Sequence, residues 1–147
     1  MTIEELNLEP VAKNAATILQ AKYPQLEFTS GRRSTFQQAH AMAGNVVLNR
    51  KWIGQTYLAG AKLQAWVDKN PQAKTVDAIT AGLEQVMKAM PEDELVKISR
   101  HLTGRAFDVR PVTANAAAIK ADIRALPGLH KFLEKEGGLV RWHAQFQ

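Results

Sequence analysis

The chain contains no cysteine among its 147 residues, so it can form no disulfide and offers no thiolate to a metal. Any metal site must therefore be built from histidine and carboxylate side chains. Long apolar runs are also missing, and none approaches the ~18 residues that a membrane-spanning helix needs. The first ten residues, MTIEELNLEP, are acidic where a secretory signal is basic and then apolar. We therefore expect synthesis in the cytoplasm without a signal peptide.

Aromatic residues make up 7% of the chain, and its basic residues are scattered along the sequence. The formal net charge of +5 favours polyanionic partners such as nucleic acid, anionic lipid or a bacterial cell wall, although it also serves solubility. Nucleic-acid-binding proteins usually concentrate Lys and Arg on one face, and no basic stripe with interleaved aromatic residues is visible here. The charge pattern therefore argues against nucleic acid as the partner.

The composition, 46% hydrophobic and 22% charged, is that of an ordinary globular protein of one-domain length. We predict a single domain over residues 1–147. In the first half, apolar residues at helical spacing predict four helices, with Ser34 and Thr75 as N-caps of the second and the fourth. These helices are predicted over residues 8–22, 35–50, 56–69 and 75–89, and a short strand over 26–31.

After residue 94 the apolar spacing changes from helical to alternating. The segments LVKISRH (95–101), AFDVR (106–110) and GLVRWHAQF (138–146) alternate and therefore predict strands. Gly104 lies between the first two segments, as a hairpin connection requires.

The expected fold combines these strands with further helices over residues 113–126 and 128–136. It is α+β: a small, mostly antiparallel sheet with helices packed on one face and a zinc cleft on the other. The strands of this sheet are expected near residues 27, 96, 107 and 142.

Each of the last three predicted strands carries a histidine or an aspartate on the face that does not enter the core. Alternation places His101, Asp108 and His143 there. Two imidazoles and one carboxylate would leave the fourth tetrahedral position open to water, the arrangement of catalytic rather than structural zinc. Zinc lowers the pKa of its water toward ~7 and polarises a carbonyl, so peptide hydrolysis is the expected chemistry. The alternative is that all three are ordinary structural residues, as we expect for His40 and His130.

Three segments match motifs of known zinc peptidases. SRHLTGRAFDV (99–109) matches S-x-H-x-x-G-x-A-x-D, SGRRSTFQQ (30–38) matches S-G-x-R-S-x-x-x-Q, and RWHAQF (141–146) is similar to the segment that supplies the last zinc ligand. On these motifs the chain resembles the M15 family, which includes D-Ala-D-Ala carboxypeptidases and dipeptidases and phage L-alanyl-D-glutamate endopeptidases. The segments occur in the family's order and span residues 30–146.

The resemblance implies that the two histidines and the aspartate bind Zn²⁺, and it implies roles for four other residues. Arg33 would hold the substrate or stabilise the oxyanion, because a guanidinium offers several fixed donors where negative charge develops. Ser99 would orient a ligand. Gln38 would brace the site rather than react, and Trp142 would support the last ligand beside it.

The chain departs from the family at one position. The family places a catalytic Glu or Asp three residues before its last histidine ligand, and this chain has Val140 there. A valine cannot transfer a proton, and losing such a group typically costs a factor of ~10²–10⁴. The nearest acidic residues are Glu134 and Glu136, and Glu136 is the first candidate because the two glycines that follow it would let the loop fold back over the metal. Otherwise a carboxylate from elsewhere in the chain transfers the proton, or the protein is catalytically impaired or inactive.

The resemblance therefore implies a hydrolase, a zinc metallopeptidase that cuts the peptidoglycan stem peptide next to a D-amino acid. We expect a monomeric bacteriophage or prophage endolysin of the L-alanyl-D-glutamate endopeptidase type, which acts on the cell wall after release. A D-Ala-D-Ala carboxypeptidase is the alternative within the family. From another class, a catalytically impaired, metal-containing protein that binds the cell wall also fits the sequence.

Overall fold

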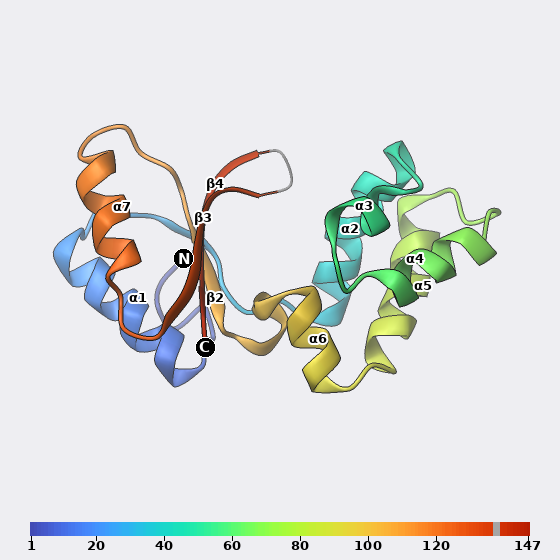
Figure 1. Cartoon of the computed structure of the whole chain (residues 1–147), viewed down its shortest axis with the longest axis horizontal. Helices are drawn as coiled ribbons and strands as arrows, with labels where there is room; N and C mark the ends of the chain where they lie inside the picture. Colours follow the sequence, from blue (N-terminus) through green and yellow to red (C-terminus); the bar gives the residue numbers. More distant parts are fainter. Residues whose placement is uncertain (137–138) are drawn as a thin grey trace. The chain divides into compact units, whose positions relative to one another are not determined.

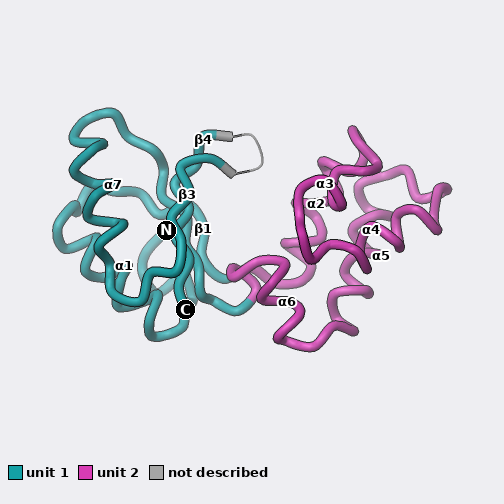
Figure 2. Tube along the Cα trace, in the orientation of Figure 1, with its two compact units in different colours: residues 1–32, 103–147 teal, residues 33–102 magenta. Residues whose placement is uncertain are grey.

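The computed structural model describes residues 1–136 and 139–147, without the side chains of residues 136 and 139 (Figure 1). Contacts divide the chain into two compact units (Figure 2): unit 1 comprises Met1–Arg32 and Thr103–Gln147, and unit 2 comprises Arg33–Leu102. Unit 2 is therefore inserted in the sequence between the two segments of unit 1. The division into units says which residues contact one another and not whether each unit folds independently. The single domain over residues 1–147 therefore stays a prediction.

Unit 1 is built on an antiparallel sheet of four strands, β1 (Phe28–Ser30), β2 (Ala106–Val109), β3 (Leu129–Glu136) and β4 (Leu139–Phe146). Their order is β1-β2-β4-β3, and each neighbouring pair is antiparallel. The prediction of an α+β fold with a small antiparallel sheet is confirmed. The composition of the sheet differs from the prediction, because residues near 96 form no strand and residues 129–136 do.

One face of this sheet carries the core of unit 1. Helices α1 (Pro10–Lys22) and α7 (Ala116–Arg124) lie on the same side of the sheet in Figure 1 and pack against it. Phe107 lies in this core. Its ring centroid is 5.3 Å from that of Phe28 and 5.4 Å from that of Phe146. The residues of β2 and β4 that alternate with this apolar set face away from α1 and α7.

Unit 2 is helical and has its own hydrophobic cluster. Its helices are α2 (Thr35–Leu48), α3 (Trp52–Thr56), α4 (Ala61–Lys69), α5 (Val76–Lys88) and α6 (Glu92–Ile98). Both predicted N-caps are confirmed: the Ser34 side chain accepts from the Gln37 N–H in a capping box, and Thr75 accepts from the Ala78 N–H. Within the described part of the chain, no helix has the length and apolar character needed to cross a bilayer.

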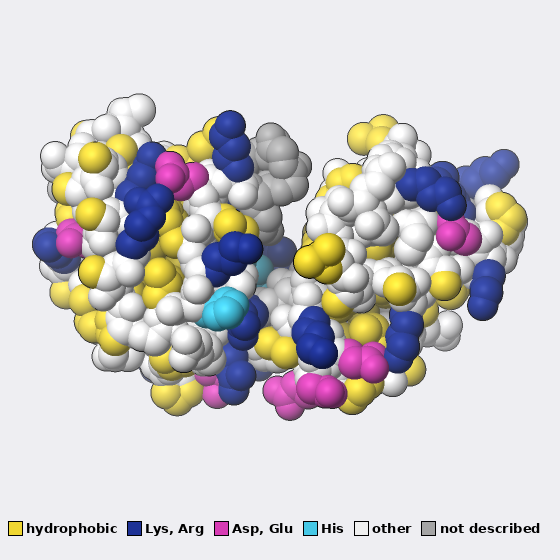
Figure 3. Space-filling model, viewed as in Figure 1, with side chains coloured by type: hydrophobic (Ala, Val, Ile, Leu, Met, Phe, Trp, Pro, Cys, Tyr) yellow, Lys and Arg dark blue, Asp and Glu magenta, His cyan; other side chains and the backbone are white. Residues whose placement is uncertain are grey.

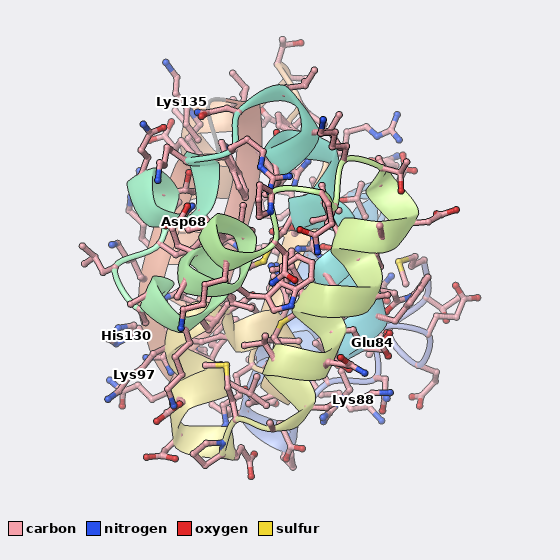
Figure 4. The ribbon with its side chains drawn as sticks, turned by 90° about the vertical axis from the view of Figure 1, so that its right-hand side faces the viewer. Asp68, Glu84, Lys88, Lys97, His130 and Lys135 are labelled. Carbon is pink, nitrogen blue, oxygen red and sulfur yellow. The ribbon has the colours of Figure 1, made fainter. Side chains whose placement is uncertain are left out.

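Charged pairs lie on the surface of unit 2, both within one helix and between elements. Figure 4 shows Glu84 and Lys88 one turn apart on α5, where their side chains form an ion pair of 2.9 Å. Asp68, on α4, accepts from Lys51 at 3.0 Å. Such exposed pairs contribute little to stability, so the apolar cluster holds this unit together.

The prediction of a strand over residues 95–101 is wrong. Residues 95–98 lie in helix α6, and residues 100 and 101 lie in the short 3-10 helix η1 (Arg100–Thr103). Three acidic residues fill the first turn of α6, where they interact favourably with the helix dipole. Pro91 is the N-cap, and Ile98 is buried in the cluster of unit 2. Alternation over so few residues does not distinguish a strand from two short helices.

The prediction of a helix over residues 128–136 is also wrong. Leu129, Phe132 and Leu133 have helical spacing in the sequence, yet they lie in β3, paired with β4. The register between β3 and β4 shifts between Leu129 and Lys131, and again between Leu133 and Lys135. The first shift puts an extra residue in β3 and the second puts one in β4. The extra residue in β3 interrupts its two-residue period, so the segment imitates a helical pattern.

Candidate metal centre

Asp108 and His143 are cross-strand partners in the middle of the sheet of unit 1. Their neighbours on β2 and β4 face the core, so both polar side chains lie on the opposite face. Each is almost completely buried, with 1% of Asp108 and 4% of His143 exposed. The Nδ1 atom of His143 lies 2.9 Å from Oδ1 of Asp108. Alternation in the sequence predicts the common face of these two residues correctly.

His101 joins them from η1, the short helix that leads into β2, and it is 1% exposed. One ligand atom from each of His101, Asp108 and His143 lies within 4.8 Å of the other two. The structure therefore brings together the three residues that the sequence analysis singled out. The prediction that His101 lies on a strand is wrong, because the chain reaches the cluster through a helical turn.

A glycine shapes the turn between His101 and β2. Gly104 has a φ of +72°, a left-handed conformation that other residues rarely adopt. A Cβ atom there would lie 2.6 Å from Nη2 of Arg32. That guanidinium is held in turn by the Glu9 carboxylate at 2.7 Å and by the Asn7 carbonyl at 2.9 Å. Glycine is thus required at position 104 for two reasons: the Arg32 guanidinium approaches the backbone closely, and the backbone has a positive φ angle.

The three side chains fit a metal ion in geometry and in chemistry. Two ligand atoms each about 2.0–2.1 Å from a tetrahedral metal lie about 3.3 Å apart. The 2.9 Å between His143 Nδ1 and Asp108 Oδ1 is close to this value, and 4.8 Å bounds all three separations. Two imidazole nitrogens and one carboxylate oxygen suit several divalent metals. The cluster could therefore hold a metal ion.

Neutral side chains contact each of these residues. Oε1 of Gln145 lies 2.9 Å from Nε2 of His143, and the Ser30 hydroxyl donates to Oδ2 of Asp108 at 2.5 Å. Ser99 accepts from the main-chain N–H of His101 at 3.2 Å, so the residue expected to orient a ligand contacts the backbone of a candidate ligand. The sequence analysis missed the contact of Gln145, although the two-residue spacing from His143 puts both on one face of β4.

Arg33 and Gln38 lie together in unit 2. The main-chain N–H of Arg33 donates to the carbonyl of His101 at 2.9 Å. Its guanidinium donates to Oε1 of Gln38 at 3.4 Å, and the Gln38 amide donates to the Tyr57 hydroxyl at 3.4 Å. Gln38 is buried in α2. The expected bracing role of Gln38 therefore corresponds to a contact with Arg33, and Tyr57 extends it.

Trp142 belongs to the core of unit 1 and not to the ligand face. It is buried with the apolar cluster, and the Lys120 ammonium lies 5.6 Å from its ring centroid. Trp142 precedes His143 in β4, so its side chain points to the opposite side of the sheet. Its support for the last ligand is therefore indirect, through the position of the strand.

A bulge changes the face on which Val140 lies. His143 pairs with Leu133 and Val140 pairs with Lys135, so β4 takes three steps where β3 takes two. This extra residue puts Val140 on the same face as His143. Val140 is 64% exposed, whereas strict alternation along GLVRWHAQF would predict it on the apolar core face with Trp142. The position that would hold a catalytic acid in the family thus lies on the ligand face.

The two acidic candidates, Glu134 and Glu136, differ in their surroundings. Glu134 accepts from Lys120 at 2.6 Å and from Arg124 at 2.8 Å, both on α7. The hydrogen bond from Lys120, followed by that from Arg124, lowers the pKa of Glu134 below its ordinary value. This carboxylate therefore serves an ion-pair network on the helix side of the sheet. The main chain of Glu136 pairs with Leu139, and its side chain lies outside the described residues.

Basic side chains also lie on the ligand face of the β3–β4 hairpin. Lys131 pairs with Gln145 and Lys135 with Val140, so the register puts both lysines on the face of His143. Both are exposed, and Figure 4 shows Lys135 and His130 toward opposite ends of β3. Elsewhere, basic and acidic side chains are interspersed over the face drawn in Figure 3. This distribution agrees with the scattered charge of the sequence.

Comparison of the chain with protein-family models, curated proteins and solved structures finds no match. The interpretation of the site therefore depends on the residues of this chain and their geometry.

Proposed function

We propose that this protein is a zinc metallopeptidase that cleaves the peptidoglycan stem peptide next to a D-amino acid. The observation that carries the proposal is the buried cluster of His101, Asp108 and His143, whose ligand atoms lie within 4.8 Å of one another. A buried carboxylate beside two imidazoles is costly unless a cation or strong hydrogen bonds compensate it. The resemblance of three sequence motifs to the M15 family supports zinc as the ion and peptide hydrolysis as the reaction.

Bound zinc would supply a water nucleophile near neutral pH and polarise the scissile carbonyl. The protein's own residues bind and orient the substrate over the face of the sheet that carries Asp108 and His143. Arg33 offers a guanidinium to a substrate carboxylate or to the charge that develops on the carbonyl oxygen. Gln38 holds that guanidinium at 3.4 Å, which limits the orientations that it can adopt.

The substrate that we favour has a carboxylate beside the scissile bond, as L-alanyl-D-glutamate has. Lys131 and Lys135 supply positive charge on the ligand face of the hairpin, and the chain has a net charge of +5. Both features attract an anionic wall polymer. We propose that the protein acts as a monomeric phage or prophage endolysin after release to the cell wall. Cleavage of D-Ala-D-Ala is the alternative, because its terminal carboxylate would also suit Arg33.

The departing amine requires a proton, which Val140 cannot give. We assign this role to Glu136 from the sequence, because it is the acidic residue followed by two glycines that would let the loop fold back over the metal. A general acid or base typically contributes a factor of ~10²–10⁴. The second candidate function follows from Val140: a metal-containing protein that has lost the acid and retains the fold to bind the cell wall.

The test combines metal analysis with digestion of purified peptidoglycan. Protein prepared without chelator should contain about one zinc per chain, and mass spectrometry should find stem peptides cut next to a D-residue. His143→Ala should lose both zinc and cleavage. The control is His130→Ala, which removes an exposed histidine from the partner strand β3 and should change neither. Intact stem peptides with fully zinc-loaded protein would refute the peptidase, and co-sedimentation of that protein with peptidoglycan would then favour the wall-binding function.

A further inference from the structure

Each of the two cross-strand ligands has one polar atom held by a neutral side chain. Nε2 of His143 lies 2.9 Å from Oε1 of Gln145, and Oδ2 of Asp108 accepts from the Ser30 hydroxyl at 2.5 Å. The other atom of each group, Nδ1 of His143 and Oδ1 of Asp108, faces its counterpart at 2.9 Å. The four residues thus form one chain of polar contacts across β1, β2 and β4.

We propose that Gln145 and Ser30 are positioning residues that select the metal-binding atoms, Nδ1 of His143 and Oδ1 of Asp108. This inference rests on the proposed metal centre and adds to it the choice of atoms and the residues responsible. An amide oxygen can only accept a hydrogen bond, so Oε1 of Gln145 requires a hydrogen on Nε2 of His143. In the neutral ring the lone pair then belongs to Nδ1.

The contact between His143 and Asp108 is compatible with this choice of atoms. Nδ1 and Oδ1 lie 2.9 Å apart; in the metal-free protein a hydrogen on Nδ1 would make this contact a hydrogen bond, and a metal ion bound to both atoms would take the place of that hydrogen. The Ser30 hydroxyl contacts Oδ2 of Asp108, and Oδ1 is the atom that faces His143. The two neutral side chains therefore direct one nitrogen and one oxygen toward a common point.

The sheet itself sets these contacts. Gln145 follows His143 by two residues on β4 and so shares its face, and Ser30 is the register partner of Asp108 across β1 and β2. Gln145 supplies an acceptor without a second negative charge beside the histidine. A zinc ion held with one carboxylate keeps a net positive charge, which favours an anionic substrate and a polarised carbonyl.

The experiment measures zinc affinity by competition with a chromophoric chelator for the wild type, Gln145→Leu, Gln145→Glu and Ser30→Ala. Loss of an outer-layer partner of a ligand typically weakens metal binding 10–100-fold, so we expect a loss of about this size for Gln145→Leu and a loss of about tenfold for Ser30→Ala. Gln145→Glu keeps the acceptor and should bind zinc at least as tightly as the wild type. The control Gln147→Leu makes the same exchange at an exposed position two residues on, and should bind normally.

A second measurement identifies directly which nitrogen of the His143 ring carries the hydrogen and which binds zinc. A general loss of stability would not change this result. In ¹⁵N NMR spectra of the zinc-loaded wild type, the His143 ring should carry its hydrogen on Nε2 and bind through Nδ1. Gln145→Leu should lose this preference for one tautomer. A hydrogen on Nδ1 in the loaded wild type, or zinc affinity of Gln145→Leu within twofold of the wild type, would overturn the inference and leave the metal centre standing. A wild-type protein that takes up no zinc would overturn the metal centre, and the inference with it.

Discussion

Asp108 and His143 lie directly opposite each other on β2 and β4, with Nδ1 and Oδ1 separated by 2.9 Å. Directly opposite residues of antiparallel strands have Cβ atoms within about 4.5–5.5 Å, so the register alone brings the two candidate ligand groups within reach of each other. The same register buries Phe107 and Ala144 on the other side. The packing of the core therefore fixes the geometry of the candidate site.

Gly104→Ala should destabilise the protein by about 1–3 kcal/mol, the usual cost of a left-handed residue other than glycine held in a folded chain. The new Cβ would also lie 2.6 Å from the Arg32 guanidinium. Urea unfolding measures the change. Gly44→Ala is the matched control: Gly44 lies inside α2, and a Cβ added there would meet no atom within 4 Å, so alanine should stabilise by about 0.5–1 kcal/mol. Equal effects of the two substitutions would contradict this account of Gly104.

Val140→Glu should raise the rate of stem-peptide cleavage at least ~100-fold if the wild type is limited by the missing acid. The bulge in β4 puts residue 140 on the face of His143, and its exposure leaves room for a longer side chain. Digestion of peptidoglycan under zinc saturation provides the rate. The control is Val140→Gln, because glutamine has nearly the same shape as glutamate and cannot transfer a proton. A similar increase in cleavage rate for Val140→Gln would exclude proton transfer as the cause.

Glu136→Gln should retain zinc and the fold while losing at least ~100-fold in turnover, because an amide cannot donate or accept the proton of the reaction. Glu134→Gln is the comparison on the same strand, and it should keep its activity because Glu134 is engaged by Lys120 and Arg124. Rates and zinc content are measured on the same preparations. Full activity of Glu136→Gln would assign the proton transfer to another group.

Asp122→Asn should remove part of the acid sensitivity of the fold. Hydrogen bonds from Tyr23 and then from Lys22 lower the pKa of Asp122 below its ordinary 3.8. A carboxyl with a lowered folded-state pKa stabilises the protein above the unfolded-state value and loses that contribution as the pH falls through the folded-state value. The free energy of unfolding, measured from neutral pH to below 3.8, should therefore fall less steeply in Asp122→Asn than in the wild type. Parallel curves would show that this contact makes no contribution.

Much of the fold follows from local sequence. Ser34 and Thr75 begin α2 and α5 as predicted, because a side-chain oxygen satisfies a backbone N–H of the first turn wherever the helix packs. The alternation of β2 and β4 is also predicted correctly, and with it the common face of Asp108 and His143. These features depend on neighbours within a few residues, which the sequence contains.

Other features required partners that are distant in the chain. Residues 129–136 form a strand because β4 supplies their hydrogen bonds and α7 covers one side, while the bulge between Leu129 and Lys131 interrupts their alternation. Residues 92–98 form a helix because Ile98 packs into unit 2 and acidic residues fill the first turn. Short segments carry weak local preferences, so tertiary contacts decide between helix and strand.

The residue types alone set the chemistry available to this protein: no thiolate, two histidines and one aspartate as the candidate ligands, and a valine where the resembling family has an acid. How these residues meet depends on the folded chain. It brought His101 to the cluster from a 3-10 helix rather than a strand, held Asp108 and His143 through Ser30 and Gln145, and turned Val140 onto their face with a bulge. Pairing register and bulges arise between strands, so no single segment of the sequence specifies them.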